Sequence, residues 1–406
     1  MSADTAPGVN AEAVRPLALG WPHLLRAILL PFAVTRIMLV LVGWIAMNQL
    51  HHQPVTGAWQ IGPSGMVTPT QSPVSANAWP VVNMWSRWDA GWYLTVAKNG
   101  YSFSAGSYSN TAFYPLYPMC MRLVHAIIPG SSDASWFAAG VVVSNLALLV
   151  ALLYLFELVR AQSDEATAAR SVLYLLIFPT TLFLSAVYSE SSFLALSLAC
   201  FYYARRAKWW WAGLCGAGAA LTRAAGVLLV IPLAIIYLEQ MNWKIRFRLH
   251  AMAIGMVPLA LLSYSTYLRL SFHNAMAVKD AQAAWGRKLT WQWNTIIEFF
   301  RGPLAVHSGA HSIIDLATVV IFCLLTIVVA RRLALAYTAY TVACLLLITA
   351  WGSFISAPRY VLMMFPCIIV LAILGKNEKL DRAITVLSSG LAALFMVLFT
   401  VWEWVS

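Results

Sequence analysis

Long apolar stretches alternate along the chain with short groups of basic residues. Each stretch predicts a helix buried in lipid, because a helix satisfies its own backbone hydrogen bonds where no water is present. Several stretches are shorter than the roughly 20 residues that a straight crossing needs, so those helices should tilt or end inside a cavity. About eleven transmembrane helices are expected, near residues 24–47, 136–159, 168–187, 189–204, 209–222, 224–240, 249–270, 312–330, 333–350, 358–374 and 383–403.

The composition agrees with a protein that crosses the membrane many times. Hydrophobic residues make up 61% of the 406 residues and charged residues only 10%, which is more apolar surface than a water-soluble core can hide. The net charge of +11 would suggest nucleic acid in a soluble domain, but the basic residues lie between the apolar stretches, and no nucleic-acid partner is expected. We predict an all-α polytopic membrane protein, with a cytoplasmic tail at 1–23 and one transmembrane domain at 24–406.

The distribution of charge predicts the topology. With the N-terminus in the cytoplasm, every basic group falls on the cytoplasmic side, as the positive-inside bias requires. The other side then holds two long segments, 48–135 and 271–311, and three short turns. The charges that topology does not explain gather on this extracytoplasmic face, namely Asp89, Glu190, Arg223 and Arg359.

An acid lies among tryptophans in the first long outer segment. As one helix, residues 85–96 would place Trp85, Trp88, Trp92 and Val96 in an apolar stripe, with Asp89 and Tyr93 on the face beside it. Tryptophan suits the membrane interface because its ring is apolar and its N–H still reaches water. The pattern therefore predicts a helix lying at the membrane surface that holds a carboxylate near lipid. Further along, residues 111–118 contain two prolines and predict a short re-entrant or surface helix.

Each charge also has an ordinary structural explanation. Asp89 could pair with Arg87 or Lys98, and Glu190 could stabilise the positive end of the helix that it opens. Arg223 joins two short helices and could cap the carbonyls of the first. Arg359 follows Pro358 near the start of a helix, where it could reach lipid headgroups.

Together the four charges favour a reactive site. An acid and two arginines framed by aromatic residues suit the attack of an acceptor hydroxyl on a sugar held by a lipid phosphate. The acid would take the hydroxyl proton, and the arginines would steady the departing phosphate. A phosphate leaving group is weakly basic, so no second carboxylate is required, in contrast to the paired acids of a glycosidase.

Several ordered motifs resemble the PIG-V mannosyltransferases, the enzymes of GPI-anchor synthesis and their bacterial relatives. The resemblance covers residues 24–240, returns at 350–370 and is weak between them. The motifs are Trp88–Tyr93, Gly100–Tyr101, Ala112–Pro118, Tyr188–Glu190 with Phe193, Leu221–Arg223 with Gly226, and Pro358–Tyr360.

The resemblance implies the GT-C membrane glycosyltransferase fold and inversion at the anomeric carbon. It also implies a polyprenyl-phosphate-linked sugar donor, usually mannose, and a lipid or glycan acceptor. Asp89 matches the acid of the first outer loop and is the expected catalytic base. The substrate-binding residues expected from these motifs are Trp88, Trp92, Tyr93, Tyr117, Tyr188, Glu190, Arg223, Arg359 and Tyr360.

The remaining expectations concern cofactors, setting and rival functions. The six cysteines include no Cys-x-x-Cys pair, so no disulfide framework, zinc site or other cofactor is expected, and a divalent metal is left open. Neither long outer segment contains an Asn-x-Ser/Thr acceptor, which favours a bacterial plasma membrane over the endoplasmic reticulum.

Two other classes of function could explain charges within a membrane protein. A lipid or solute transporter would also need intramembrane charges, but no internal repeat is visible. A non-catalytic membrane partner would have no reason to concentrate an acid and arginines on the outer face.

Overall fold

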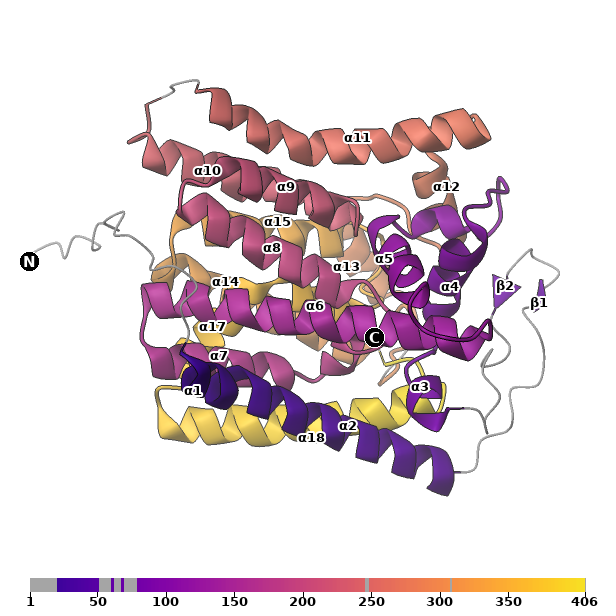
Figure 1. Cartoon of the computed structure of the whole chain (residues 1–406), viewed down its shortest axis with the longest axis horizontal. Coiled ribbons are helices and arrows are strands. Elements are labelled where there is room, and N and C mark those ends of the chain that lie inside the picture. The colour runs from indigo at the N-terminus through magenta and orange to yellow at the C-terminus, as the bar shows by residue number, and fades with distance from the viewer. Residues whose placement is uncertain are drawn as a thin grey trace, which may run out of the picture.

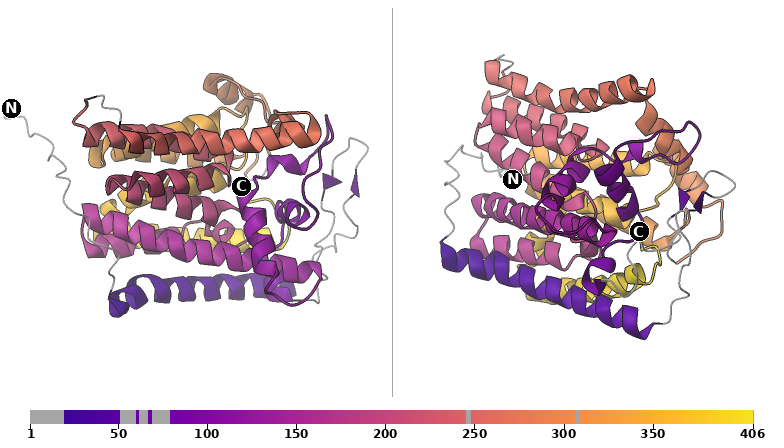
Figure 2. Two further views of the ribbon diagram at one scale, coloured as in Figure 1. Left: turned by 45° about the horizontal axis from the view of Figure 1, so that its top comes forward. Right: turned by 45° about the vertical axis from the view of Figure 1, so that its right-hand side comes forward.

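The computed structural model describes residues 20–50, 60–61, 67–68, 79–244, 248–306 and 309–405. The tail expected at 1–23 lies almost wholly outside the described residues, as does much of the first outer segment between 51 and 78. The described chain is a bundle of helices that run side by side, with a group of short helices at the end away from α1 (Figure 1). Two further views show the same separation (Figure 2).

Five helices are long and apolar enough to cross a membrane. The first is continuous over Trp21–Gln49 and consists of α1 (Trp21–Leu24), a π-helical turn (Leu25–Leu29) and α2 (Leu30–Gln49). The others are α6 (Asp133–Gln162), α11 (Met252–Phe272, preceded by the turn Leu249–Ala251), α14 (Ile313–Arg332) and α18 (Glu378–Thr400). A sixth is added if the pair Ala357–Met363 and Phe365–Leu374, bent by 84°, is one span.

The remaining expected spans correspond to shorter helices. These are α7 (Glu165–Leu176), α8 (Glu190–Arg205), α9 (Trp209–Ala220), α10 (Val230–Gln240, preceded by the 3-10 turn Ala224–Leu229) and α15 (Leu335–Thr349). The bent pair consists of α16 (Ala357–Tyr360), the turn Val361–Met363 and α17 (Phe365–Leu374). An all-α, multi-pass membrane protein is confirmed. The expected positions of the spans agree with helices, but by length and composition only five or six qualify, because several helices break before they are long enough.

Proline and a buried arginine explain one of these breaks. α7 ends at Leu176, three residues before Pro179, which cannot continue a helix. Arg36, in the middle of α2, donates to the Leu176 carbonyl at 2.7 Å and to the Thr181 hydroxyl at 3.0 Å. The carbonyls exposed by the break therefore receive donors from another helix, as the membrane interior demands. A 3-10 turn, η3 (Thr181–Leu184), follows before α8 begins.

Ion pairs connect the loops at the end of the bundle where the described chain begins. Lys376 Nζ lies 2.7 Å from Asp164 Oδ2, which connects the α6–α7 loop to the α17–α18 loop. Arg205 and Glu239 join the ends of α8 and α10 at 2.8 Å. Arg205 and Lys376 belong to basic clusters that the sequence assigns to the cytoplasm, and the helix ends that these ion pairs connect lie opposite the short helices (Figure 1).

Short elements cover the other end of the bundle. Two residues in each of β1 (Gln60–Ile61) and β2 (Val67–Thr68) pair antiparallel, Gln60 opposite Thr68. The helices there are α3 (Pro80–Asn83), α4 (Ala90–Asn99), α5 (Leu116–His125), α12 (Ala277–Ala284) and α13 (Gln292–Phe299), with a 3-10 turn, η2 (Asn110–Ala112). The short helix expected at 111–118 begins only at Leu116, as α5, because Asn110–Ala112 form the turn η2 and Pro115 precedes the helix. It buries Tyr117 and Met121 and exposes Met119 and Leu123, as a helix at a membrane surface does.

Candidate active site

The Trp-rich segment is a turn followed by a helix. Trp88 has φ +52°, a left-handed conformation that no helix interior contains, and α4 begins only at Ala90. The single helix expected over 85–96 is therefore wrong. Tyr188 explains the turn, because its hydroxyl accepts from the Asp89 backbone N–H at 3.1 Å and donates to the Arg87 carbonyl at 3.0 Å.

α4 also lies deeper than a surface helix. Trp92, Tyr93 and Val96 are all buried, and Trp92 stacks on Phe113 with ring centroids 5.8 Å apart. The expected surface location of this helix is thus corrected to an internal one. The apolar face that the sequence assigned to lipid instead packs against α5, α6 and the turn η2.

The Asp89 carboxylate faces an arginine that lies far away in the sequence. Asp89 occupies the cap position of α4, yet its side chain makes no capping hydrogen bond. Its Oδ2 accepts from Arg359 Nη1 at 2.6 Å, and the side chain keeps 24% of its surface exposed. The two local partners considered from sequence are engaged elsewhere, because Arg87 donates to Asn83 and Lys98 pairs with Asp133 at 2.9 Å. Arg359 therefore holds one oxygen of the Asp89 carboxylate, and part of the side chain stays accessible.

A strained turn brings Arg359 to this position. Ser356, with φ +70°, precedes α16, and the chain then bends by 84° before α17. Thr180 Oγ1 donates to the Pro358 carbonyl at 2.6 Å, which ties this bend to the break after α7. Arg359 is only 4% exposed, so it does not extend to lipid headgroups. Its guanidinium lies 4.6 Å from the centre of the Tyr188 ring.

Glu190 joins the two arginines. It is the first residue of α8 and is 1% exposed, and its Oε1 accepts a short hydrogen bond from Arg359 Nε. Arg223 Nη1 lies 2.6 Å from the same oxygen. Arg223 stands in an extended conformation between α9 and the turn that precedes α10, so its side chain reaches Glu190 and does not cap α9. Asp89, Arg359, Glu190 and Arg223 thus form one chain of alternating charges.

A cavity of about 480 Å³ opens onto this charge cluster. One wall is charged and aromatic, and another is apolar and formed by α11 and α15. The lining includes one carboxylate and four cations. The charged lining residues are Asp89, Arg223, Lys279, Arg287 and Arg359, the aromatic ones include Tyr93, Phe113, Trp285, Trp351 and Tyr360, and the apolar ones include Leu261, Leu347 and Ile348. The space suits an amphiphilic ligand with an anionic head.

Tyr93 is on this wall but cannot serve as the base. Burial raises the pKa of the Tyr93 hydroxyl, and the negative charge of Glu190 raises it further. The hydroxyl is within 2.8 Å of Ser189 Oγ. A phenol that stays protonated can donate a hydrogen bond to a ligand but cannot accept its proton. Among the described residues that line the cavity, Asp89 is the carboxylate available for that task.

Five expected substrate-binding residues do not line the cavity. Glu190 and Tyr188 contact Arg359, which does line the cavity. Tyr117 is buried and bonds to the Gly140 carbonyl at 3.0 Å and to Ser144 at 2.8 Å. Trp88 packs edge-on against Trp402 and Trp404, and Trp92 packs against Trp285.

The sequence analysis missed residues of the second outer segment. Lys279, Trp285 and Arg287 lie on the cavity wall, although 271–311 shows only weak resemblance to the family motifs. One signal was available. The predicted topology assigns the basic residues Lys279 and Arg287 to the side of the membrane that the positive-inside bias leaves poor in such residues, so topology does not explain them.

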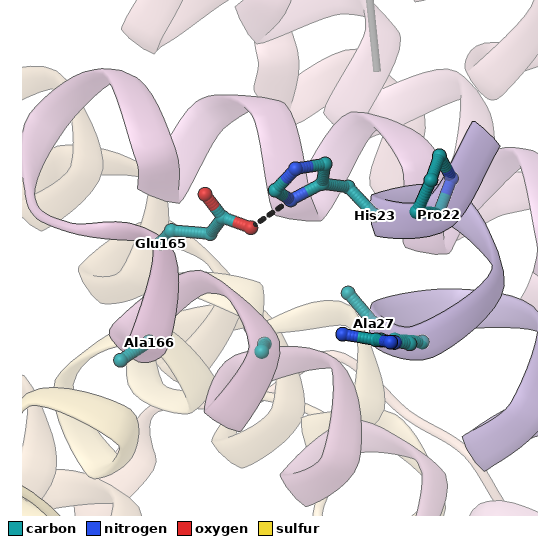
Figure 3. Close-up of a pocket in the computed structure, with 7 residues that line it drawn as sticks. Pro22, His23, Ala27, Glu165 and Ala166 are labelled. Atoms are coloured by element: carbon teal, nitrogen blue, oxygen red, sulfur yellow. Dashed lines mark hydrogen bonds and ion pairs between the residues drawn. The ribbon is translucent and has the colours of Figure 1, made fainter. Parts of the chain in front are cut away.

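A second cavity, of about 440 Å³, lies at the opposite end of the bundle (Figure 3). It lies between the start of the first helix and α7, where His23 Nδ1 is 2.5 Å from Glu165 Oε1. Both side chains are more than half exposed. This hollow lacks an acid held by a buried cation, and it is remote from the charge cluster. Among the described residues, no three His, Cys, Asp or Glu side chains gather to hold a metal ion.

Comparison with known sequences gives one family and several relatives. The family described as Mannosyltransferase (PIG-V) matches residues 26–271. GPI alpha-1,6-mannosyltransferase 2 of Rattus norvegicus is 29% identical over 212 residues, covering 50% of this chain and 40% of the relative. GPI mannosyltransferase 2 of Drosophila pseudoobscura pseudoobscura is 34% identical over 113 residues, covering 26% and 24%. The matches therefore span less than half the length of these relatives.

Solved structures give distant similarity. ArnT from Cupriavidus metallidurans, bound to undecaprenyl phosphate, is 14% identical with a TM-score of 0.48, covering 91% of this chain and 76% of that one. The oligosaccharyltransferase of Archaeoglobus fulgidus in its apo form is 12% identical with a TM-score of 0.41, covering 92% and 56%.

Proposed function

The chain belongs to the PIG-V mannosyltransferase family, and from this premise we propose that it transfers mannose from a polyprenyl-phosphate-linked donor to a lipid or glycan acceptor. The proposal includes inversion at the anomeric carbon and the GT-C type of fold that the family resemblance implies. The observation that carries it is the cavity, which combines one partly exposed carboxylate, several cations and an apolar wall.

The two walls of the cavity suit the two parts of such a donor. A polyprenyl-phosphate sugar has an isoprenoid tail, an anionic phosphodiester and a polar sugar. Leu261 on α11 and Leu347 and Ile348 on α15 offer an apolar surface for the tail. Asp89, Tyr93 and Tyr360 on the charged side offer hydrogen-bonding groups for the sugar. The sugar would then lie beside the carboxylate.

Asp89 is the proposed general base. The acceptor oxygen forms a bond to the anomeric carbon while the bond from that carbon to the phosphate oxygen breaks. The proton of the acceptor hydroxyl passes to Asp89, and the electron pair of the broken bond stays on the phosphate. Arg359 holds one carboxylate oxygen at 2.6 Å, which leaves the other oxygen free to face the acceptor. Because the acceptor attacks from the face opposite the phosphate, the configuration inverts.

Glu190 and the two arginines are proposed to position this base. Glu190 is buried and touches Arg359 and Arg223, so it fixes both guanidiniums without reaching the cavity. Arg359 in turn orients Asp89. Preorganised charges of this kind contribute to rate because they need not rearrange as the transition state forms.

We place the reaction on the extracytoplasmic face, in a bacterial plasma membrane. The short helices α4 and α12, which contribute residues to the cavity wall, lie at the end of the bundle away from the loops that hold the basic clusters assigned to the cytoplasm (Figure 1). On that face a lipid-linked donor can be supplied, whereas nucleotide sugars stay in the cytosol. No metal or other cofactor is part of the proposal.

A donor-class experiment tests the proposal. The full chain, purified into lipid nanodiscs, is incubated with membrane lipids of its source cells and with radiolabelled mannose on either polyprenyl phosphate or a guanosine nucleotide. We expect a labelled lipid or glycan product from the polyprenyl-phosphate donor, with release of polyprenyl phosphate, and none from the nucleotide donor. Transfer from the nucleotide donor alone would contradict the proposal.

A further inference from the structure

Two of the four cations that line the active-site cavity form no ion pair with an acid among the described residues. Arg223 and Arg359 are engaged with Glu190 and Asp89, so this group of two acids and two bases is close to neutral. Lys279 and Arg287 also line the cavity, and no ion pair is found for either within the described part of the chain. An anionic ligand in this cavity would therefore meet unneutralised positive charge at these two residues.

Arg287 is held in a defined position. Its guanidinium carbon lies 5.2 Å from the centre of the Tyr360 ring, and that of Arg223 lies 5.3 Å from the same ring. Stacking on an aromatic ring restrains a guanidinium while its N–H groups remain free to bind an anion. The hydrogen bond that its guanidinium donates to the Gln282 side chain is long, at 3.5 Å. Arg287 is thus oriented but not saturated with acceptors.

The end of α12 determines this placement. Gly286 has φ +72°, and the N–H groups of Gly286 and Arg287 donate back to the carbonyls of Ala283 at 3.0 Å and Gln282 at 3.2 Å. These two bonds form the glycine-terminated helix end known as the Schellman motif. The preceding residue, Trp285, contacts Tyr108 at 4.9 Å and Trp92 at 5.6 Å between ring centroids. The segment is therefore anchored to the first outer loop, and the chain turns Arg287 toward Tyr360.

We propose that Arg287, assisted by Lys279, binds the phosphate of the lipid-linked donor and of the polyprenyl phosphate that leaves. This inference rests on the proposed function. It transfers the phosphate-binding role expected for Arg223 and Arg359 to a segment outside the residues 26–271 that match the family. Arg223 and Arg359 are then positioning residues for Asp89. Arg287 contributes a planar fork for two phosphate oxygens, and Lys279, which is exposed on α12, contributes a second charge.

Direct binding of a phosphate probe tests the inference without depending on turnover. Farnesyl phosphate and its uncharged counterpart farnesol are titrated into the full-length protein in nanodiscs by calorimetry. The variants are Arg287→Ala, Arg287→Lys and Lys279→Ala. Arg301→Ala is the matched control, because it removes one positive charge from the same outer segment but does not line the cavity.

We expect Arg287→Ala to raise the Kd for farnesyl phosphate about ten- to a hundred-fold, the usual effect of losing a charge-assisted hydrogen bond. Arg287→Lys should lie between the wild type and Arg287→Ala, and Lys279→Ala should raise the Kd a few-fold. Farnesol should bind all variants alike, and Arg301→Ala should match the wild type with both probes. Unchanged melting temperatures show that the variants are folded.

Two outcomes separate this inference from the proposed function. If folded Arg287→Ala and Arg287→Lys both bind farnesyl phosphate as tightly as the wild type, the inference is overturned and mannosyl transfer is untouched. If phosphate binding depends on Arg287 but the wild type transfers no sugar from the lipid-linked donor, the phosphate site stands and the proposed function fails.

Discussion

At the scale of single residues, the site depends on a buried carboxylate shared by two arginines. Glu190 is 1% exposed, and its second oxygen has no hydrogen-bond partner among the described residues. Removing such a charge from water costs several kcal/mol, and close cations must offset that cost. Arg359 therefore has two tasks, because it neutralises Glu190 and orients Asp89.

This double role predicts a large loss of stability when Arg359 is removed. Arg359→Ala leaves Glu190 with Arg223 as its one cation and should reduce the free energy of unfolding by about 3–5 kcal/mol. Adding Glu190→Gln to Arg359→Ala should recover part of that loss, because the uncompensated charge disappears. Unfolding in bicelles measures both effects. Arg301→Ala, which breaks an exposed pair with Glu298, should change stability by less than about 1 kcal/mol. Equal losses in the two arginine variants would contradict this account.

The sequence predicts the members of this cluster but not their pairing. The sequence groups these residues only because all four are charges expected on the same side of the membrane that the positive-inside bias does not explain. They are Asp89, Glu190, Arg223 and Arg359. Their partners are distant in the chain, since Asp89 and Arg359 are 270 positions apart. Local spacing favours Arg87 and Lys98 as partners of Asp89, and both are engaged elsewhere. Only the packing of distant helices decides which cation reaches which acid.

At the scale of elements, broken helices bring the charges together. Arg223 follows α9, Glu190 opens α8 after the turn at Thr181–Leu184, and Arg359 lies at the 84° bend before α17. A continuous helix would direct these side chains along its own faces. The apolar pattern predicts where helices lie, but it does not show where they break. Pro179 is a visible signal for one break, whereas the break at Arg223 depends on a close contact between backbones.

Gly226 is the residue that permits the break at Arg223. A Cβ at this position would lie 2.3 Å from the Ala220 backbone nitrogen and 2.4 Å from the Ala219 carbonyl carbon, so the backbone would have to move. We expect Gly226→Ala to displace Arg223 from Glu190 and to lower both melting temperature and transfer activity, the latter at least ten-fold. Gly255→Ala in α11, where a Cβ meets nothing within 4 Å, is the control and should be neutral or slightly stabilising. Similar behaviour of the two variants in thermal unfolding and transfer assays would argue against this role.

At the scale of the whole molecule, two outer segments far apart in sequence form one site. Thr111 Oγ1 donates to the Ala277 carbonyl at 3.2 Å, and the Tyr264 hydroxyl donates to the Thr111 carbonyl at 2.9 Å. Trp285 packs among aromatic residues of the first outer loop. The sequence predicts that both segments share a compartment, but not that they touch, because the second one carries no recognisable motif.

The shared compartment gives a prediction for labelling in intact cells. Single cysteines at Ser107 and Asn294, in a background without the six native cysteines, should react with a membrane-impermeant thiol reagent applied from outside. Cysteines at Ser163 and Asn377, in the loops joined by Asp164 and Lys376, should react only after the membrane is opened. Labelling of Ser107 and Asn294 from opposite sides would rule out a site built from both segments.

The most direct test of the central claim is mannosyl transfer by Asp89→Asn. The substitution keeps the size and most of the polar contacts of the side chain but removes the basic oxygen. We predict a fall of roughly two to four orders of magnitude in turnover from the polyprenyl-phosphate donor, the usual contribution of a general base, with folding and farnesyl phosphate binding retained. Near-normal turnover by folded Asp89→Asn protein would contradict the assignment of Asp89 as the base.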